Sequence, residues 1–109
     1  MKTAILLTFL GLSTHFAGVL SDADKLFDDD NFSEAYDLYQ TLVETAETSG
    51  VDAARALDRG TRCLAKLDRF DEADAFIDSA LASHGSSWRV AERAAFQFVH
   101  LDHDGRLVA

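Results

Sequence analysis

The sequence contains no proline, one cysteine, one tryptophan and few basic residues. Because proline is absent, no residue forces a break in a helix, and long uninterrupted helices are allowed. Cys63 is alone, so the chain cannot form an internal disulfide and depends on packing for its stability. The sequence has ten basic and nineteen acidic residues, which gives a net charge of −9. This acidic balance disfavours nucleic acid and anionic lipid surfaces as partners, because both carry negative charge.

Residues 1–21 have the pattern of a secretory signal peptide. Lys2 gives a positive start, residues 4–12 are an apolar run, and residues 19–21 form a plausible cleavage site. Polar residues 13–15 interrupt the run too early for a membrane span, which needs about 20 apolar residues. The other interpretation is a buried first helix of the domain. The pattern predicts a periplasmic or extracellular protein that is cleaved near Ser21 and has no membrane attachment afterwards.

Helical periodicity covers almost all of residues 22–109, and no stretch alternates as a strand would. The predicted helices span 22–29, Ser33 to about Thr48, Asp52 to about Leu67, Asp71 to the residue before Gly85, and Ser86 or Ser87 to a stop at Gly105. The inner positions of the second to fourth helices are Ala35, Tyr39, Leu42, Val43 and Ala46, then Leu57, Gly60, Leu64 and Leu67, then Ala73, Phe76, Ile77, Ala80 and Leu81. Trp88, Ala91, Ala95 and Phe98 form one stripe on the fifth. The fold class is therefore all-α, in one domain over residues 22–109.

One sequence pattern occurs twice. NFSEAYDLYQTLV, residues 31–43, returns as RFDEADAFIDSAL, residues 69–81. In each copy a phenylalanine precedes the helix, an alanine lies in its first turn, and a large apolar residue follows one turn later. A repeat of about 20 to 50 residues predicts a stacked array of helical hairpins.

The repeat resembles the tetratricopeptide repeat, whose second helix carries an aromatic, a small and a large apolar residue in this order. These roles are filled by Phe32, Ala35 and Tyr39 in the first copy and by Phe70, Ala73 and Ile77 in the second. Leu64 stands where the family has an aromatic residue, and Asp30 and Asp68 stand where its turn glycine is usual. The terminal proline is missing, and the period is longer than the family's. Over residues 22–85 the resemblance implies a short tetratricopeptide-like hairpin array, an α-solenoid fragment of about five helices; a generic helical bundle is the alternative.

The tail has a second resemblance. Residues 86–109 are similar to the helical segment near the start of some bacterial alpha-2-macroglobulin-like proteins, which implies the amino-terminal piece of a large protease-trapping protein. No thioester signature is present in the sequence. Aligning 30–35 and 68–73 with 104–109 makes the fifth helix the first half of a third hairpin. On this interpretation the domain is truncated at its C-terminal end, and the stripe that begins at Trp88 lacks a cover.

Three groups of residues are candidates for a chemical site. Cys63 has no recognisable base nearby in the sequence, so a small core residue is the simpler interpretation. His100, Asp102, His103 and Asp104 could share a metal or could simply form a turn. Residues 28–31 resemble the start of a calcium loop but lack its central glycine and its final glutamate, where Tyr39 stands. The sequence therefore predicts no catalytic, cofactor or metal site.

The strongest binding signal is a basic stripe, formed by Arg55, Arg59, Arg62 and Lys66. Their spacing of four, three and four places them on one helix face, and Arg69 lies just beyond. The family resemblance implies that this helix lines the concave groove of the array. Arginine side chains there would bind another protein or an acidic peptide segment. The alternatives are ion pairs with Asp71, Asp74 and Asp78 on the next helix, or a position in solvent.

The sequence thus predicts an exported, non-catalytic helical-repeat module for protein–protein interaction or scaffolding. Two alternatives stay open: the amino-terminal segment of a macroglobulin-like protein, and a small metal-binding or enzymatic helical domain.

Overall fold

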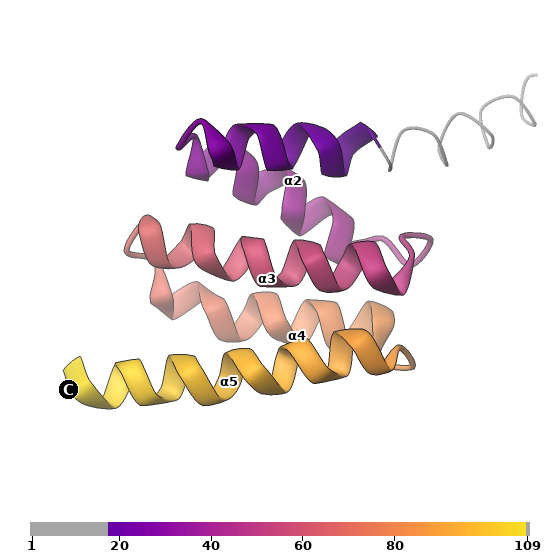
Figure 1. Cartoon of the computed structure of the whole chain (residues 1–109). Coiled ribbons are helices and arrows are strands. Elements are labelled where there is room, and N and C mark those ends of the chain that lie inside the picture. The colour runs from indigo at the N-terminus through magenta and orange to yellow at the C-terminus, as the bar shows by residue number, and fades with distance from the viewer. Residues whose placement is uncertain (1–17, 109) are drawn as a thin grey trace, which may run out of the picture.

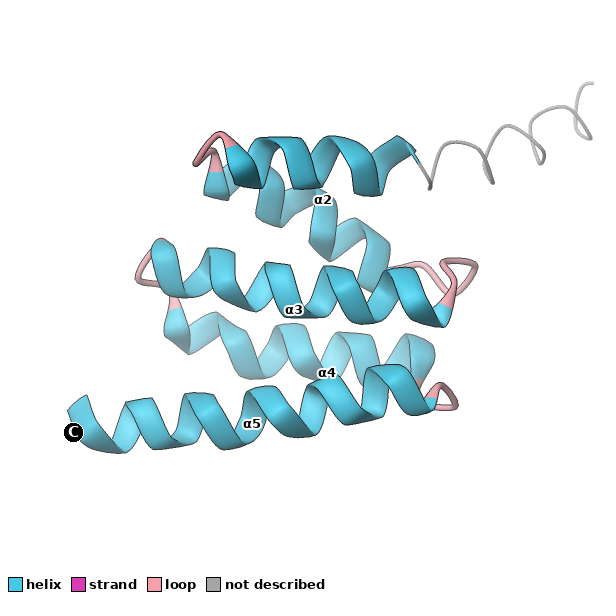
Figure 2. Ribbon diagram, viewed as in Figure 1, coloured by secondary structure: helices cyan, strands magenta, loops and turns pink. Residues whose placement is uncertain are grey.

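The computed structural model describes the backbone of residues 18–108 and the side chains of residues 18–99. Every regular element in this part of the chain is helical, which confirms the predicted all-α class. Residues 18–28 are helical and are followed by α2 (Phe32–Glu44), α3 (Gly50–Lys66), the 3-10 turn η1 (Phe70–Glu72), α4 (Ala73–His84) and α5 (Trp88–Val108) (Figure 2). Most of the predicted signal segment lies outside the described residues. The helix over 18–28 continues through Ser21, and Val19 is buried.

The helices form two layers (Figure 1). The front layer contains residues 18–28, α3 and α5, and the back layer contains α2 and α4. Consecutive helices run in opposite directions, so the three front helices run the same way. α3 lies at the centre and contacts α2, α4 and α5. The core fills the space between the layers, and its largest fully buried side chains include Tyr39, Leu42, Leu57, Leu64 and Ile77.

The two front-to-back turns have the same backbone geometry. Asp30 and Asp68 both adopt the left-handed conformation, with φ values of 65° and 60°. In the first turn, the amides of Asp30 and Asn31 donate to the carbonyls of Phe27 and Leu26 at 3.0 and 2.8 Å. In the second, the amides of Asp68 and Arg69 donate to the carbonyls of Ala65 and Leu64 at 3.2 and 2.8 Å. Each pair of bonds is a Schellman motif, and the two motifs stand at equivalent positions of the two sequence repeats.

The predicted inner faces of α2, α3 and α4 are confirmed at almost every position. Ala35, Tyr39, Leu42, Val43, Leu57, Gly60, Leu64, Ala73, Phe76, Ile77 and Ala80 are all buried. Leu67 and Leu81 are half-buried, and Ala46 is exposed beyond the end of α2. Gly60 has a specific packing role, because a Cβ there would overlap the ring of Phe76 from α4. The glycine therefore lets α3 and α4 approach closely.

The two phenylalanines of the repeat are not equivalent. Phe32 is half-buried and packs edge-on against Phe27, with ring centroids 5.4 Å apart. Phe70 is 48% exposed. An aromatic ring therefore fills the turn in the first copy only.

Several predicted helix ends were wrong. Asn31, and not Ser33, precedes α2, since its carbonyl accepts the first helical hydrogen bond, from the amide of Ala35. α2 ends at Glu44 instead of Thr48, because Thr45 is extended (ψ 114°). Ser49 caps α3 by accepting a hydrogen bond from the amide of Asp52, the residue predicted to be the cap. Asp71 lies inside η1, so α4 begins two residues later, at Ala73.

α5 differs most from its prediction. It continues through Gly105 to Val108, so the predicted stop and the turn of a third hairpin at residues 104–105 are wrong. One glycine lowers helix stability by about 1 kcal/mol, which does not by itself end a helix. Val90, Ala94 and Gln97 form its buried side. On the predicted stripe Trp88, Ala91 and Ala95 are exposed, and Phe98 is half-buried.

The buried repeat alanines give a direct test of the two hairpins. Ala35 is 0% exposed and Ala73 is 2% exposed, so leucine at either position should overpack the interface and cost about 1–3 kcal/mol. Ala75→Leu and Ala82→Leu on the exposed side of α4 are matched controls that should be nearly neutral. Urea unfolding of the four variants measures the difference. Equal stabilities for core and control variants would contradict the packing.

Candidate interaction surfaces

The basic stripe divides into two halves. Arg55 and Arg59 reach back to Asp24 on the preceding front helix, with Nε of Arg55 3.0 Å from Oδ2 and Nη1 of Arg59 3.5 Å from Oδ1. Arg59 also lies 3.8 Å from a carboxylate oxygen of Asp28. Its guanidinium carbon is 5.1 Å from the ring centroid of Phe27, a cation–π arrangement. These two arginines therefore join two front helices.

Asp24 has a third partner, which comes from the back layer. The hydroxyl of Tyr39 donates to Oδ1 of Asp24 at 2.6 Å, and Tyr39 is 0% exposed. Burial, followed by the hydrogen bond to Asp24, raises the pKa of Tyr39 well above its usual range. The phenol stays protonated at neutral pH and can donate to the carboxylate. Asp24 thus connects the helix over 18–28 with both α2 and α3.

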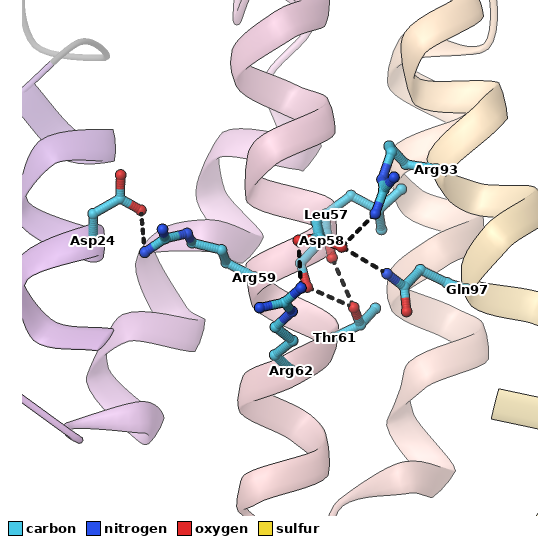
Figure 3. Close-up of polar contacts among 8 residues, drawn as sticks. All are labelled: Asp24, Leu57, Asp58, Arg59, Thr61, Arg62, Arg93 and Gln97. Carbon is cyan, nitrogen blue, oxygen red and sulfur yellow. Dashed lines mark hydrogen bonds and ion pairs between the residues drawn. The ribbon is translucent and has the colours of Figure 1, made fainter. Parts of the chain in front are cut away.

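Arg62 and Lys66 form the other half of the basic stripe. The side chain of Arg62 is 63% exposed and lies 3.6 Å from Asp58 on its own helix (Figure 3). Lys66 is exposed and takes part in none of the ion pairs among the described side chains. Arg69, just beyond α3, donates two hydrogen bonds to Glu72, which lower the pKa of that carboxyl. The described part of the stripe that remains available to a partner is therefore Arg62 and Lys66.

The predicted alternative, pairing with the next helix, named the wrong acidic residues. The ion pairs of the described residues connect the basic stripe to Asp24, Asp28 and Asp58, and none of them reaches Asp71, Asp74 or Asp78. The stripe faces along the front layer instead of toward the back layer. Helical spacing shows which residues share a face, but not which neighbouring helix that face meets.

A second carboxylate cluster was not anticipated. Asp58 on α3 accepts hydrogen bonds from Nη2 of Arg93 at 2.8 Å and from Nε2 of Gln97 at 3.0 Å, both on α5 (Figure 3). Its side chain is only 19% exposed. The signal was present in the sequence, because Arg93 and Gln97 follow Arg55 and Arg59 by the same interval that separates the two copies of the repeat. The repeat period therefore relates the two donor pairs, whereas the acceptor Asp58 follows Asp24 at an interval four residues shorter.

Exposed apolar side chains gather where α3 and α5 begin. A shallow cleft of about 160 Å³ is lined by Val51, Ala54, Trp88, Arg89, Glu92 and Arg93. Val51 is 56% exposed and Trp88 64% exposed. The guanidinium carbon of Arg89 lies 4.6 Å from the centroid of the Trp88 ring. Exposed aromatic and arginine side chains are the residue types enriched at protein interfaces.

The candidate groups for catalysis or metal binding have structural explanations where they are described. Cys63 is 0% exposed, and burial raises the pKa of its thiol to about 11, so it is protonated at neutral pH. Residues 28–31 form the end of a helix and the turn at Asp30. The side chains of the cluster from His100 to Asp104 lie outside the described residues. No group of three or more potential metal ligands occurs among residues whose side chains are described.

Comparison with protein families, curated proteins and solved structures found no match to this chain. The two resemblances seen in the sequence therefore remain predictions. None of the described helices is both long and apolar enough to cross a membrane.

Proposed function

We propose that this chain is an exported, non-catalytic helical-repeat module that binds an acidic segment of another protein. The observation that carries the proposal is the repeated turn, in which Asp30 and Asp68 share one conformation and one hydrogen-bond pattern. Repeated hairpins stack into extended surfaces that bind other proteins. The protonated, buried thiol of Cys63 supports a non-catalytic role.

The proposed contact is the exposed half of the basic stripe. Arg62 and Lys66 are four residues apart on the front layer, where tetratricopeptide-like arrays bind their partners. A carboxylate-rich segment suits these side chains, since an arginine can donate two parallel hydrogen bonds to one carboxylate. Arg55 and Arg59 would support this surface from behind, because both are held by Asp24.

Binding of a labelled glutamate-rich peptide to the full chain tests this proposal, with a glutamine-rich peptide of equal length as the reference. We expect the glutamate-rich peptide alone to bind, and Arg62→Glu with Lys66→Glu to weaken it by about tenfold or more, because each attraction becomes a repulsion. The melting temperature should stay unchanged. Arg89→Glu, an exposed arginine on α5, is the matched control. Equal binding of both peptides, or equal losses in both variants, would contradict the proposed contact.

Export rests on the pattern of residues 1–21. We expect the protein recovered outside the cytoplasm to begin near Asp22, as determined by amino-terminal sequencing. Recovery of the chain only inside the cytoplasm, beginning at Met1, would contradict this part of the proposal.

A further inference from the structure

One type of contact between neighbouring helices occurs twice in the front layer. In each case a carboxylate on one front helix binds two side chains that lie four residues apart on the next front helix. Asp24 accepts a hydrogen bond from Arg55 and forms an ion pair with Arg59 at 3.5 Å. Asp58 accepts hydrogen bonds from Arg93 and Gln97 (Figure 3). The side chains of Asp24 and Asp58 are 21% and 19% exposed, so both contacts are partly shielded from water. We call this arrangement the carboxylate clamp.

A third carboxylate, Glu92, follows Asp58 at the interval that separates Asp24 from Asp58. This interval is four residues, about one helical turn, shorter than the interval between the two donor pairs, so Glu92 lies one turn before the position that the repeat period gives. Glu92 lies on α5 and is exposed. It takes part in none of the hydrogen bonds or ion pairs of the described side chains. Among the described front helices, α5 is the one whose carboxylate has no donor pair opposite it.

Apolar side chains share the face of α5 on which Glu92 lies. Trp88 lies four residues before it, and Ala95 and Val99 lie three and seven residues after it, so all four share one face of α5. Trp88 is 64% exposed, Val99 is 66% exposed and Ala95 is also exposed. The opposite side, with Val90 and Ala94, is buried against the rest of the protein. We call Trp88, Glu92, Ala95 and Val99 the α5 outer face.

We propose that the α5 outer face binds an amphipathic helix of a partner protein that carries two basic side chains four residues apart. The basic pair would close a third clamp on Glu92, and the apolar side of the helix would cover Trp88, Ala95 and Val99. The two existing clamps support this charge complementarity, because in each of them a pair with this spacing meets a single carboxylate. The pair is Arg55 with Arg59 in the first clamp and Arg93 with the neutral Gln97 in the second. This inference rests on the proposed function as a protein-binding module, but it names a different surface and a partner of opposite charge.

A separate protein fits this site better than a second copy of the chain. Arg55 with Arg59 and Arg93 with Gln97 are already bound to Asp24 and Asp58. Arg62 and Lys66 also lie four residues apart and are exposed, but they belong to α3, which is flanked in the front layer by the helix over 18–28 and by α5 (Figure 1). A second copy would therefore have to open its own front layer before α3 could lie along the α5 outer face.

The test uses a synthetic helical peptide of about 18 residues, with two arginines four apart beside a leucine stripe. A second peptide has glutamates in place of the arginines. Trp88 is the one tryptophan of the chain, so its emission reports on the outer face in the full-length protein. We expect the arginine peptide to shift this emission to shorter wavelength, because it removes the exposed indole from water. The glutamate peptide should leave the emission unchanged.

Charge-reversed variants decide whether Glu92 makes the contact. Glu92→Lys should weaken binding of the arginine peptide about tenfold. Glu92→Arg should allow the glutamate peptide to bind in its place. Asp78→Lys, an exposed acidic residue on α4, is the matched control and should leave binding unchanged. Equal losses with Glu92→Lys and Asp78→Lys would show general charge attraction and overturn the proposal. A dimer of the full chain that is lost in Val99→Arg would overturn it in favour of a second copy. Binding at Arg62 and Lys66 has its own peptide and variants, so either proposal can fail alone.

Discussion

Truncation of Leu64 to alanine is expected to lower the free energy of unfolding by about 2–5 kcal/mol. Leu64 is fully buried on α3 and belongs to the hydrophobic core, so its truncation would leave a cavity there. Its carbonyl also accepts the amide of Arg69 in the second turn, so relaxation of the backbone around the cavity is restricted. A loss of this size is a large part of the total stability of a small domain.

Val51→Ala on the same helix is the matched control. Val51 is 56% exposed, so removing its methyl groups should change stability by less than about 0.5 kcal/mol. Urea denaturation followed by circular dichroism at helical wavelengths measures both variants. Similar losses for Leu64→Ala and Val51→Ala would mean that α3 does not bury the side predicted from its periodicity.

Asp24→Ala is expected to cost about 1–5 kcal/mol. The substitution leaves the hydroxyl of Tyr39 without an acceptor in the interior, which costs about 1–3 kcal/mol. It also removes the ion pairs of Arg55 and Arg59, each contributing about 0–1 kcal/mol because their side chains are 50% and 26% exposed. The thermal unfolding midpoint and the urea midpoint should both fall.

A double-mutant cycle separates these contributions. Tyr39→Phe removes the hydroxyl, so Asp24→Ala should cost less in the Tyr39→Phe background than in the native chain. Asp22→Ala, at an exposed position of the same helix, is the control and should be nearly neutral. Additive losses in the cycle would contradict an energetic connection between Asp24 and Tyr39.

The buried faces could be predicted from the sequence, since helical periodicity determines them directly. Ala73, Phe76, Ile77 and Ala80 were assigned to the inside of α4, and all four are buried. The helix ends could not be predicted as well, because they depend on hydrogen bonds between neighbouring segments. Ser33 has the chemistry of a cap, but the Schellman turn that ends the preceding helix at Asp30 fixes the start of α2 at Phe32.

The candidate surface was predicted only in part, for a physical reason. The spacing of Arg55, Arg59, Arg62 and Lys66 correctly predicts one helix face. Whether a side chain is available depends on what packs beside that face, and Asp24, which binds Arg55, belongs to a helix far earlier in the sequence. The exposed Trp88 was part of the predicted stripe, whereas helical spacing alone does not distinguish Glu92, because the clamps depend on contacts between helices that are far apart in the sequence.

The repeated hairpin is tested most directly by glycine substitution at the two left-handed positions. Asp30→Gly and Asp68→Gly should each raise the free energy of unfolding by about 0.5–1 kcal/mol, because glycine adopts positive φ without steric cost. Ala65→Gly and Ala75→Gly, at exposed positions of α3 and α4, should instead lower it by about 0.5–1 kcal/mol. Urea unfolding of the full chain measures all four variants. Stabilisation at both aspartates, and a roughly additive gain in the double variant, is the predicted result. Destabilisation at either aspartate, similar to that of the alanine variants, would contradict the equivalence of the two hairpins.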